Sequence, residues 1–123
     1  MKKLVFAFIF IGAAFNVFAQ QSKYKNIDEA VKKLGPLNNF NVAVIADTVT
    51  EKFADNEQKA RAIFYWIANN IQLDPKGTRQ NDDKNILPEK VIALRKATPL
   101  GFSLLVQEMC SAANIRCLSV DGM

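Results

Sequence analysis

A segment whose apolar residues keep helical spacing, between Asp55 and Ile71, constrains the fold of this chain most strongly. It opens with residues 55–58, Asp-Asn-Glu-Gln, a capping-box pattern in which Asp55 accepts a backbone hydrogen bond and Gln58 reaches back. Apolar residues then recur every three or four positions, as on one face of a helix: Ala60, Ile63, Phe64, Ile67 and Ile71. Tyr65 and Trp66 widen that face. We therefore predict a helix over about residues 56–71, buried on much of its circumference.

Shorter helical patterns lie on both sides of this segment. A short helical turn over residues 26–33 ends at Gly35-Pro36, and a helix over about residues 41–53 presents one apolar face. After a polar segment over residues 78–85, expected to be a loop, Pro88 takes the first position of a helix that stops near Ala97.

The last predicted helix, residues 99–113, has clear start and stop signals. Thr98 can cap it, Pro99 suits its first turn, and Asn114 suits a left-handed terminus. Residues 116–120, Arg-Cys-Leu-Ser-Val, have the composition of a strand, but no partner strand is evident in the sequence, and one isolated strand is not stable in water.

The first 19 residues have the layout of a secretory signal peptide. A basic start at Met1-Lys2-Lys3 precedes an apolar run from Leu4 to Phe15, and Val17-Phe18-Ala19 provides small residues for cleavage before Gln20. We expect an exported protein, periplasmic or extracellular, with no membrane association after cleavage. The alternative is a retained membrane anchor.

The charge pattern does not favour nucleic-acid binding. Of the 16 basic residues, Lys2 and Lys3 belong to the signal peptide, which leaves 14 against 12 acidic residues in the mature part. The basic residues are scattered among acidic ones and form no stripe with interleaved aromatics, so a mixed, solvated surface is expected.

The sequence contains no histidine and two cysteines, Cys110 and Cys117. The pair allows a disulfide in an exported protein; the alternative is two buried free thiols that act as small hydrophobes. A zinc site would lack ligands, and Asp82-Asp83 lacks the further carboxylates of a calcium site, so neither a metal nor a cofactor is predicted. Ser103 and Ser111 have no base to activate them. Trp66 is expected in the core rather than at a sugar-binding surface.

Two segments, in matching order and spacing, resemble the transglutaminase-like proteins, which share a papain-like fold. Residues 55–74 resemble the family's early helix, with its aromatic-Trp-Ile core and an exit at residues 70–74, where Leu73 replaces the usual aromatic. Residues 95–122 resemble the segment that holds the family's catalytic cysteine, followed by a helix and a strand that ends near a glycine. The likeness covers roughly residues 42–123.

The resemblance implies that the nucleophile is missing. When Gly101 and Cys110 are aligned with their counterparts, Pro99 falls on the position of the catalytic cysteine, and Cys110 falls in the helix interior, where it is a poor substitute. The family's histidine and aspartate lie downstream of the position of Gly122. A thiol nucleophile needs a base and a group that orients the base, so the likeness implies an enzyme framework without the enzyme's catalytic residues.

We therefore expect a mainly helical α+β fold, the front half of a transglutaminase-like (papain-like) domain with about four helices and one strand. The expected organisation is a signal peptide at 1–19, an N-terminal extension at 20–40 and a partial domain at 41–123. The leading hypothesis is an exported pseudoenzyme that binds a protein or peptide. The alternative is a truncated fragment of a thiol acyltransferase or cysteine peptidase whose catalytic residues lie outside this chain.

Overall fold

A computed structural model of the chain describes residues 23–120 and Gly122. The expected signal peptide, residues 1–19, lies outside the described residues. Residues 23–32 are helical, and the elements that follow are α2 (Val42–Thr50), α3 (Asn56–Asn70), β1 (Gln72–Leu73), α4 (Pro75–Gln80), α5 (Pro88–Leu94), β2 (Lys96–Ala97) and α6 (Pro99–Ala112). The prediction of a mainly helical α+β fold is confirmed.

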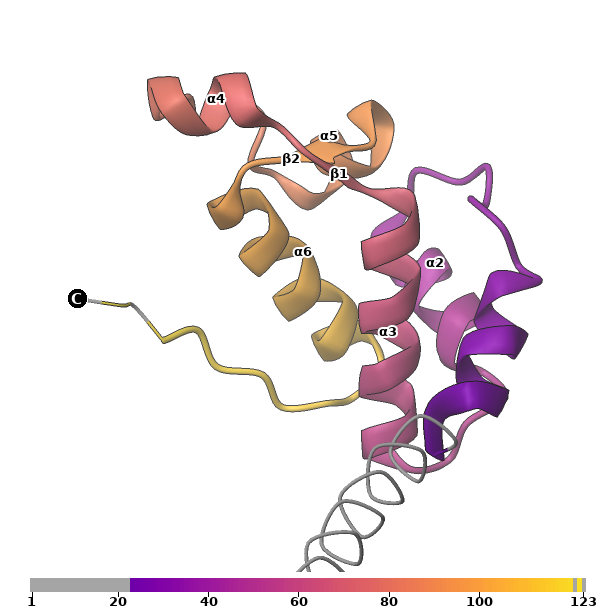
Figure 1. The fold of residues 1–123 in the computed structure, drawn as a ribbon. Helices are drawn as coiled ribbons and strands as arrows, with labels where there is room; N and C mark the ends of the chain where they lie inside the picture. Colours follow the sequence, from indigo (N-terminus) through magenta and orange to yellow (C-terminus); the bar gives the residue numbers. More distant parts are fainter. Residues whose placement is uncertain (1–22, 121, 123) are drawn as a thin grey trace, which may run out of the picture.

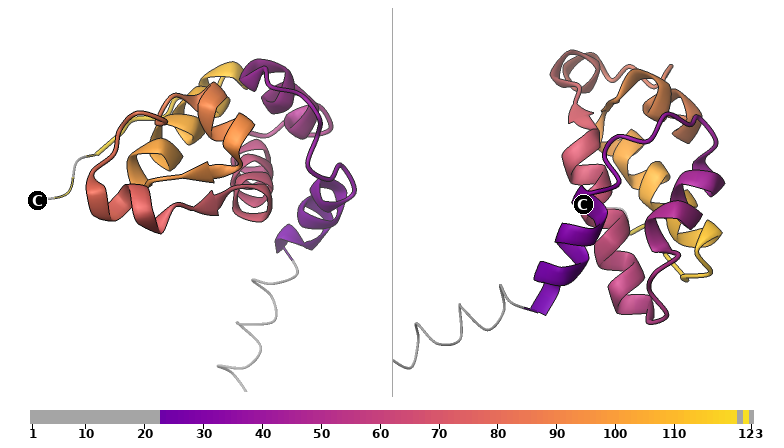
Figure 2. Two further views of the ribbon diagram at one scale, coloured as in Figure 1. Left: turned by 90° about the horizontal axis from the view of Figure 1, so that it is seen from above. Right: turned by 90° about the vertical axis from the view of Figure 1, so that its right-hand side faces the viewer.

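Helix α6 is the centre of the packing. It contacts α2, α3 and α5, and Figure 1 shows it beside α3 with the residues after it leading away from the body. The two further views place the helix of residues 23–32 against the opposite side of α3 (Figure 2). The largest side chains that are fully buried come from four helices: Trp66, Ile45, Ile63, Ile92, Leu105, Met109, Val49 and Val91.

The buried face of α3 differs from the predicted one at Phe64. Trp66 is completely buried, whereas the side chain of Phe64 is 59% exposed. The two residues are two positions apart, or about 200° around a helix, so they cannot share a face. The capping box is also wrong in part, because Asp55 stands at the N-cap but makes no side-chain hydrogen bond there.

Helix starts depend on side chains that accept backbone hydrogen bonds. Asn41 accepts from the Val44 amide at the start of α2, and Thr98 Oγ1 accepts from the Gly101 amide, 3.2 Å away, at the start of α6. Pro88 and Pro99 open α5 and α6 as predicted. Helix α2 ends at Thr50 rather than near residue 53, so the predicted helix is too long.

The sheet lies elsewhere than predicted. β1 and β2 pair in parallel, with Gln72 opposite Lys96 and Leu73 opposite Ala97. Helix α5 therefore ends at Leu94, where Arg95 takes a left-handed conformation, instead of continuing to Ala97. The crossover between the two strands contains α4 and α5, which satisfies the long connection that parallel strands need.

Two further predictions are wrong. Residues 115–120 have no regular secondary structure, because no strand of the described chain lies beside them to complete a ladder. The predicted loop over residues 78–85 begins inside α4, which Asp74 caps by accepting from the Lys76 and Gly77 amides. Asn114 does adopt the predicted left-handed conformation, with φ of 59°.

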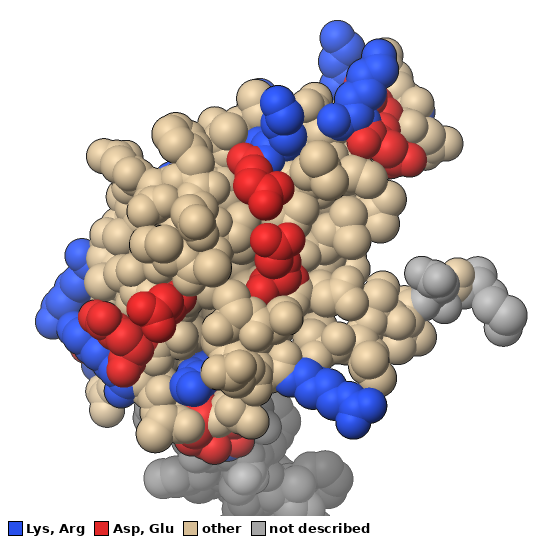
Figure 3. Space-filling model, turned by 180° about the vertical axis from the view of Figure 1, so that it is seen from behind, with Lys and Arg blue, Asp and Glu red and all other residues tan. Residues whose placement is uncertain are grey.

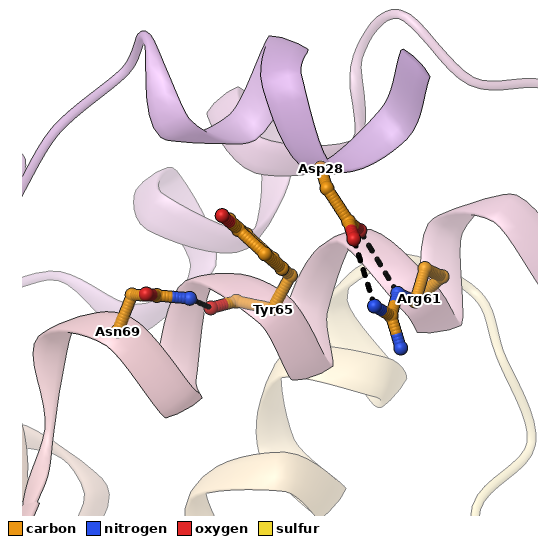
Figure 4. A network of polar contacts seen from close by, with 4 residues as sticks. All are labelled: Asp28, Arg61, Tyr65 and Asn69. Carbon is orange, nitrogen blue, oxygen red and sulfur yellow. Dashed lines mark hydrogen bonds and ion pairs between the residues drawn. The ribbon is translucent and has the colours of Figure 1, made fainter. Parts of the chain in front are cut away.

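The helix of residues 23–32 is held to α3 by charged contacts and by Ile27 and Val31, which are buried in the same apolar core as the inner face of α3. The Arg61 guanidinium donates to both carboxylate oxygens of Asp28, at 2.9 and 2.8 Å (Figure 4). Tyr24 donates its hydroxyl to Glu57, and the Arg61 guanidinium also lies 5.0 Å from the centre of the Tyr24 ring. These contacts attach a segment outside the predicted domain boundary to the domain itself.

The turn that follows this helix is fixed by two side chains. Trp66 Nε1 donates to the Gly35 carbonyl at 3.1 Å, and Arg95 Nη2 donates to the Pro36 and Leu37 carbonyls at 2.6 and 2.7 Å. The Arg95 guanidinium stacks over the Trp66 ring, 5.4 Å from its centre. Burial lowers the pKa of Arg95 from its ordinary value. One cation thus joins the N-terminal segment to α3 and to the start of β2.

Charges of both signs are interspersed on the face seen in Figure 3, where acidic and basic groups lie between large uncharged areas. Among residues 23–120, no helix is both long enough and apolar enough to cross a membrane.

The Asp28–Arg61 pair is expected to stabilise the domain measurably. Both side chains are less than one-third exposed, at 22% and 30%, and the contact is bidentate. A double-mutant cycle with Asp28→Ala and Arg61→Ala is expected to give a coupling energy of about 1 kcal/mol in urea unfolding, near the upper end for such pairs. The matched control is Lys25–Glu29, which is far more exposed and 3.9 Å apart, and for which no coupling is expected. Equal coupling in the two cycles would contradict this assignment.

The Thr98 cap is expected to support the start of α6. Thr98→Ala removes the oxygen that accepts from Gly101, so the free energy of unfolding should fall by about 1 kcal/mol. Thr98→Ser keeps that oxygen and should retain most of the stability in the same urea titration. If the serine variant loses as much as the alanine variant, the methyl group rather than the cap is responsible.

Candidate functional site

The start of α6 combines a proline with tight packing. Pro99 is exposed at the first helical position, where its missing N–H costs no intrahelical hydrogen bond. Two residues later, Gly101 is buried so closely that a Cβ there would lie 3.3 Å from both Ala97 Cβ and Val91 Cγ2. This end of the helix is therefore fixed against β2 and α5.

An open hollow of about 340 Å³ lies beside Pro99. Helix α4 and the turn after it form one wall, and the first residues of α6 form the other. The residues that line it are Gly77, Thr78, Asn81, Asp83, Thr98, Pro99 and Leu100. The hollow therefore presents hydroxyl, amide and carboxylate groups beside apolar surface, to which Leu100, 46% exposed, contributes.

The wall from α4 is built around the cap of that helix. Asp74 Oδ1 accepts from the Gly77 amide at 3.0 Å, and a Cβ on Gly77 would meet the Asp74 carboxylate at 2.6 Å. Thr78 donates its hydroxyl to the Asp74 carbonyl at 2.6 Å, and Asn81 ends the helix in a left-handed conformation. Glycine at position 77 therefore avoids a clash with the Asp74 carboxylate, so that Asp74 can cap α4 and α4 can line the hollow.

Sequence reasoning missed this wall. It placed Pro99 correctly at the start of a helix, but it assigned residues 78–85 to an exposed loop and predicted no helix between residue 71 and that loop. An aspartate directly before a proline is a helix-start pattern, with the aspartate at the N-cap and the proline at the first position. That signal could have predicted α4 and, with it, the contribution of Thr78, Asn81 and Asp83.

The chemistry available in the hollow is limited to hydrogen bonding and one carboxylate. None of the lining residues carries a thiol or an imidazole. The backbone amides at the start of α6 and the helix dipole favour a polar or negatively polarised group. The arrangement can hold a polar chain segment, but it offers no obvious nucleophile.

Both cysteines lie at the other end of α6. Cys110 is 11 positions after Pro99, about 16 Å along a helix at 1.5 Å per residue. It is 6% exposed, and burial raises the pKa of its thiol, which the neighbouring Cys117 thiol raises further. Both residues are free thiols in the structure. A buried thiol with a raised pKa is a poor nucleophile, as inferred for Cys110 from its place in the helix.

The remaining candidates are dispersed. Ser103 and Ser111 are exposed along α6, and Trp66 is buried in the core. Asp82 accepts from the Lys84 amide within its own loop. In the part of the chain that the structure describes, no group of three or more histidine, cysteine, aspartate or glutamate residues is placed to hold a metal ion.

Comparisons with known proteins show the family of the chain. Residues 43–122 match the family model described as the transglutaminase-like superfamily. Kyphoscoliosis peptidase of Mus musculus is 24% identical over 99 residues, which are 80% of this chain and 15% of that protein. Kyphoscoliosis peptidase of Homo sapiens is 28% identical over 79 residues, 64% of this chain and 12% of that protein. The chain thus corresponds to less than one-sixth of the length of these curated relatives.

No solved structure gives a significant match to this chain. The family model nevertheless spans α2 to α6, which contain both walls of the hollow and the cysteine pair. This chain belongs to the transglutaminase-like superfamily.

Proposed function

We propose that this chain is an exported transglutaminase-like domain that performs no acyl transfer and binds a peptide or protein segment in the hollow beside Pro99. The observation that carries the proposal is the residue at the first position of α6. The resemblance places the catalytic cysteine of the family there, and this chain has a proline.

Proline at this position removes the chemistry and keeps the helix. A cysteine at a helix N-terminus gains nucleophilicity because the dipole lowers its pKa. The proline ring has no side-chain group that could attack a carbonyl, yet its backbone angle suits the first turn. The Thr98 cap and the close packing of Gly101 keep the rest of that turn intact. A damaged site would not need to preserve these features.

The hollow has the chemistry to receive a peptide. Asn81 and Asp83 line one wall, the Thr98 hydroxyl and Leu100 line the other, and the space between is open to solvent. Amide and carboxylate groups can pair with the backbone of an extended chain, while Leu100 provides apolar contact for one of its side chains.

Export is supported by the first 19 residues, whose basic start, apolar run and small residues before Gln20 match a secretory signal. We place the mature domain in the periplasm or outside the cell.

A second candidate function is favoured by the lengths of the relatives. Both are named peptidases, and this chain corresponds to 15% and 12% of them. The chain would then be the front of a thiol enzyme whose base and orienting carboxylate lie in another segment or polypeptide. Because Pro99 cannot be the nucleophile, this candidate requires a nucleophile from elsewhere. Sequencing the gene beyond the codon for Met123 tests it: an open frame with a histidine followed by an aspartate would favour it.

Restoring a thiol at the family's position is expected to give reactivity without turnover. In Pro99→Cys, the new thiol is exposed at a helix N-terminus, so iodoacetamide should modify it faster than the buried Cys110. Incorporation of a fluorescent amine into casein should stay at the level of the blank, because no imidazole is available to accept the proton.

The matched control is Pro99→Ala, which also removes the proline but adds no thiol. It should show no amine incorporation and no alkylation beyond that of Cys117 in the wild-type protein. Turnover by the wild-type protein or by the cysteine variant, as amine incorporation or as casein cleavage, would contradict the proposal of an inactive domain.

Peptide binding is expected to depend on Leu100. Fluorescently labelled, heat-denatured casein serves as an extended polypeptide probe, and its anisotropy should rise with added wild-type protein. Leu100→Asp, on the rim of the hollow, should weaken this binding at least several-fold. The control is Leu94→Asp, which replaces a similarly exposed leucine, 51% against 46%, that does not line the hollow beside Pro99. No binding, or an equal loss in both variants, would contradict the assignment.

A further inference from the structure

We infer that Cys110 and Cys117 form a dithiol site that a thiol–disulfide oxidant converts to an intrachain disulfide, which fixes the residues after α6 to the side of that helix. This goes beyond the proposed peptide binding, since the pair lies at the opposite end of α6 from Pro99. Its biological setting rests on the proposed export, because disulfides persist in oxidising compartments.

The backbone turns back on itself between the two cysteines. Helix α6 ends at Ala112, and Asn114 adopts a left-handed conformation with φ of 59°. The Ile115 amide then donates to the Cys110 carbonyl at 2.8 Å. This hydrogen bond is the type that closes a helix with a left-handed terminal residue, and it returns the chain to the last turn of α6, at Cys110 itself.

The side chains after this turn alternate between the helix and the solvent. Ile115 and Cys117 are partly buried and pack against the apolar core, whereas Arg116 is exposed and Leu118 is 73% exposed. Cys117 therefore faces the protein. Cys110 belongs to the same apolar core.

The turn brings the two cysteines to the same region. Cys117 is only two residues after Ile115, whose amide donates to the Cys110 carbonyl, and it packs against the core cluster that contains Cys110. Burial raises the pKa of Cys110, and the neighbouring Cys117 thiol raises it further. Cys117 is the more exposed of the two. An oxidant from solvent therefore reaches Cys117 first.

The reaction needs an acceptor of two electrons, here the disulfide of glutathione or of an oxidoreductase. The Cys117 thiolate attacks one sulfur of that disulfide, which forms a mixed disulfide and releases one thiolate. Cys110, once deprotonated, attacks the Cys117 sulfur and releases the second thiolate. The two cysteines lose two electrons and two protons in total, and the oxidant becomes two thiols.

The bond would add a covalent attachment to a terminal segment that otherwise packs against the core through Ile115 and Cys117. Residues 115–120 form no ladder with any strand in the described part of the chain, and one backbone hydrogen bond holds their start. A bridge at Cys117 would restrict the chain up to that residue and hold the exposed Leu118 next to the domain. The bond would stabilise the fold mainly by restricting the unfolded chain, and because the closed loop is short this gain lies toward the lower end for disulfides.

The test is oxidation of the purified, folded protein with oxidised glutathione, followed by intact mass and peptide mapping. The expected result is a loss of about 2 Da, for two hydrogens, with no glutathione adduct. Peptide mapping should find Cys110 joined to Cys117, iodoacetamide should no longer label either residue, and Tm should rise by several degrees and return after reduction.

Cys117→Ser is the matched control. It removes the exposed thiol and leaves the buried one, so oxidation should neither remove mass nor change Tm. Oxidation of the wild type in urea serves as a second comparison and should be slower than in buffer, because the folded chain holds the thiols together. The inference is overturned by a persistent glutathione adduct on Cys117, by disulfide-linked dimers, or by a bridge that forms only in urea.

Discussion

Arg95 joins parts of the chain that are far apart in sequence, and the arrangement of the domain depends on it. Its guanidinium lies over the Trp66 ring and donates to the carbonyls of Pro36 and Leu37, while its backbone ends α5 in a left-handed conformation. The carbonyl of the same residue accepts from Gln72 and begins the β1–β2 ladder. A single planar cation therefore couples the N-terminal turn, α3 and the small sheet, which a point charge on a lysine could not do with the same geometry.

The parts of the fold with strong local signals could be predicted from the sequence, and the parts that depend on tertiary contacts could not. Thr98 with Pro99 fixes the start of α6 and Asn114 its end, because caps act within one turn. Strands β1 and β2 have two residues each and therefore have no periodicity to detect. The same limit explains the wrong assignment of residues 116–120, whose composition suits a strand although no partner is present.

For the candidate site, the sequence predicted the residue that decides its chemistry and missed its surroundings. Alignment to the family predicts that Pro99 stands at the nucleophile position; the comparisons show the family over residues 43–122, and the assignment of Pro99 stays a prediction. The hollow around it depends on α4, whose Asp74 cap and Gly77 close approach bring Thr78 and Asn81 toward α6. Exposure of Phe64 illustrates the same difference: the residue has the right type for a core position but the wrong angle around α3.

The first described helix combines exposed ion pairs with the buried side chains of Ile27 and Val31, whereas the turn after it is held by buried hydrogen bonds, so the two parts differ in their sensitivity to salt. The side chains of Lys23 and Glu57 are both exposed, so their ion pair weakens when added salt shortens the distance over which charges interact. The contacts of Gly35 with the buried Trp66 are shielded from that effect. In concentrated salt, the amide hydrogens of residues 23–32 should exchange earlier than those of α3. This end of the molecule would then open first, while the turn at Gly35 stays in place.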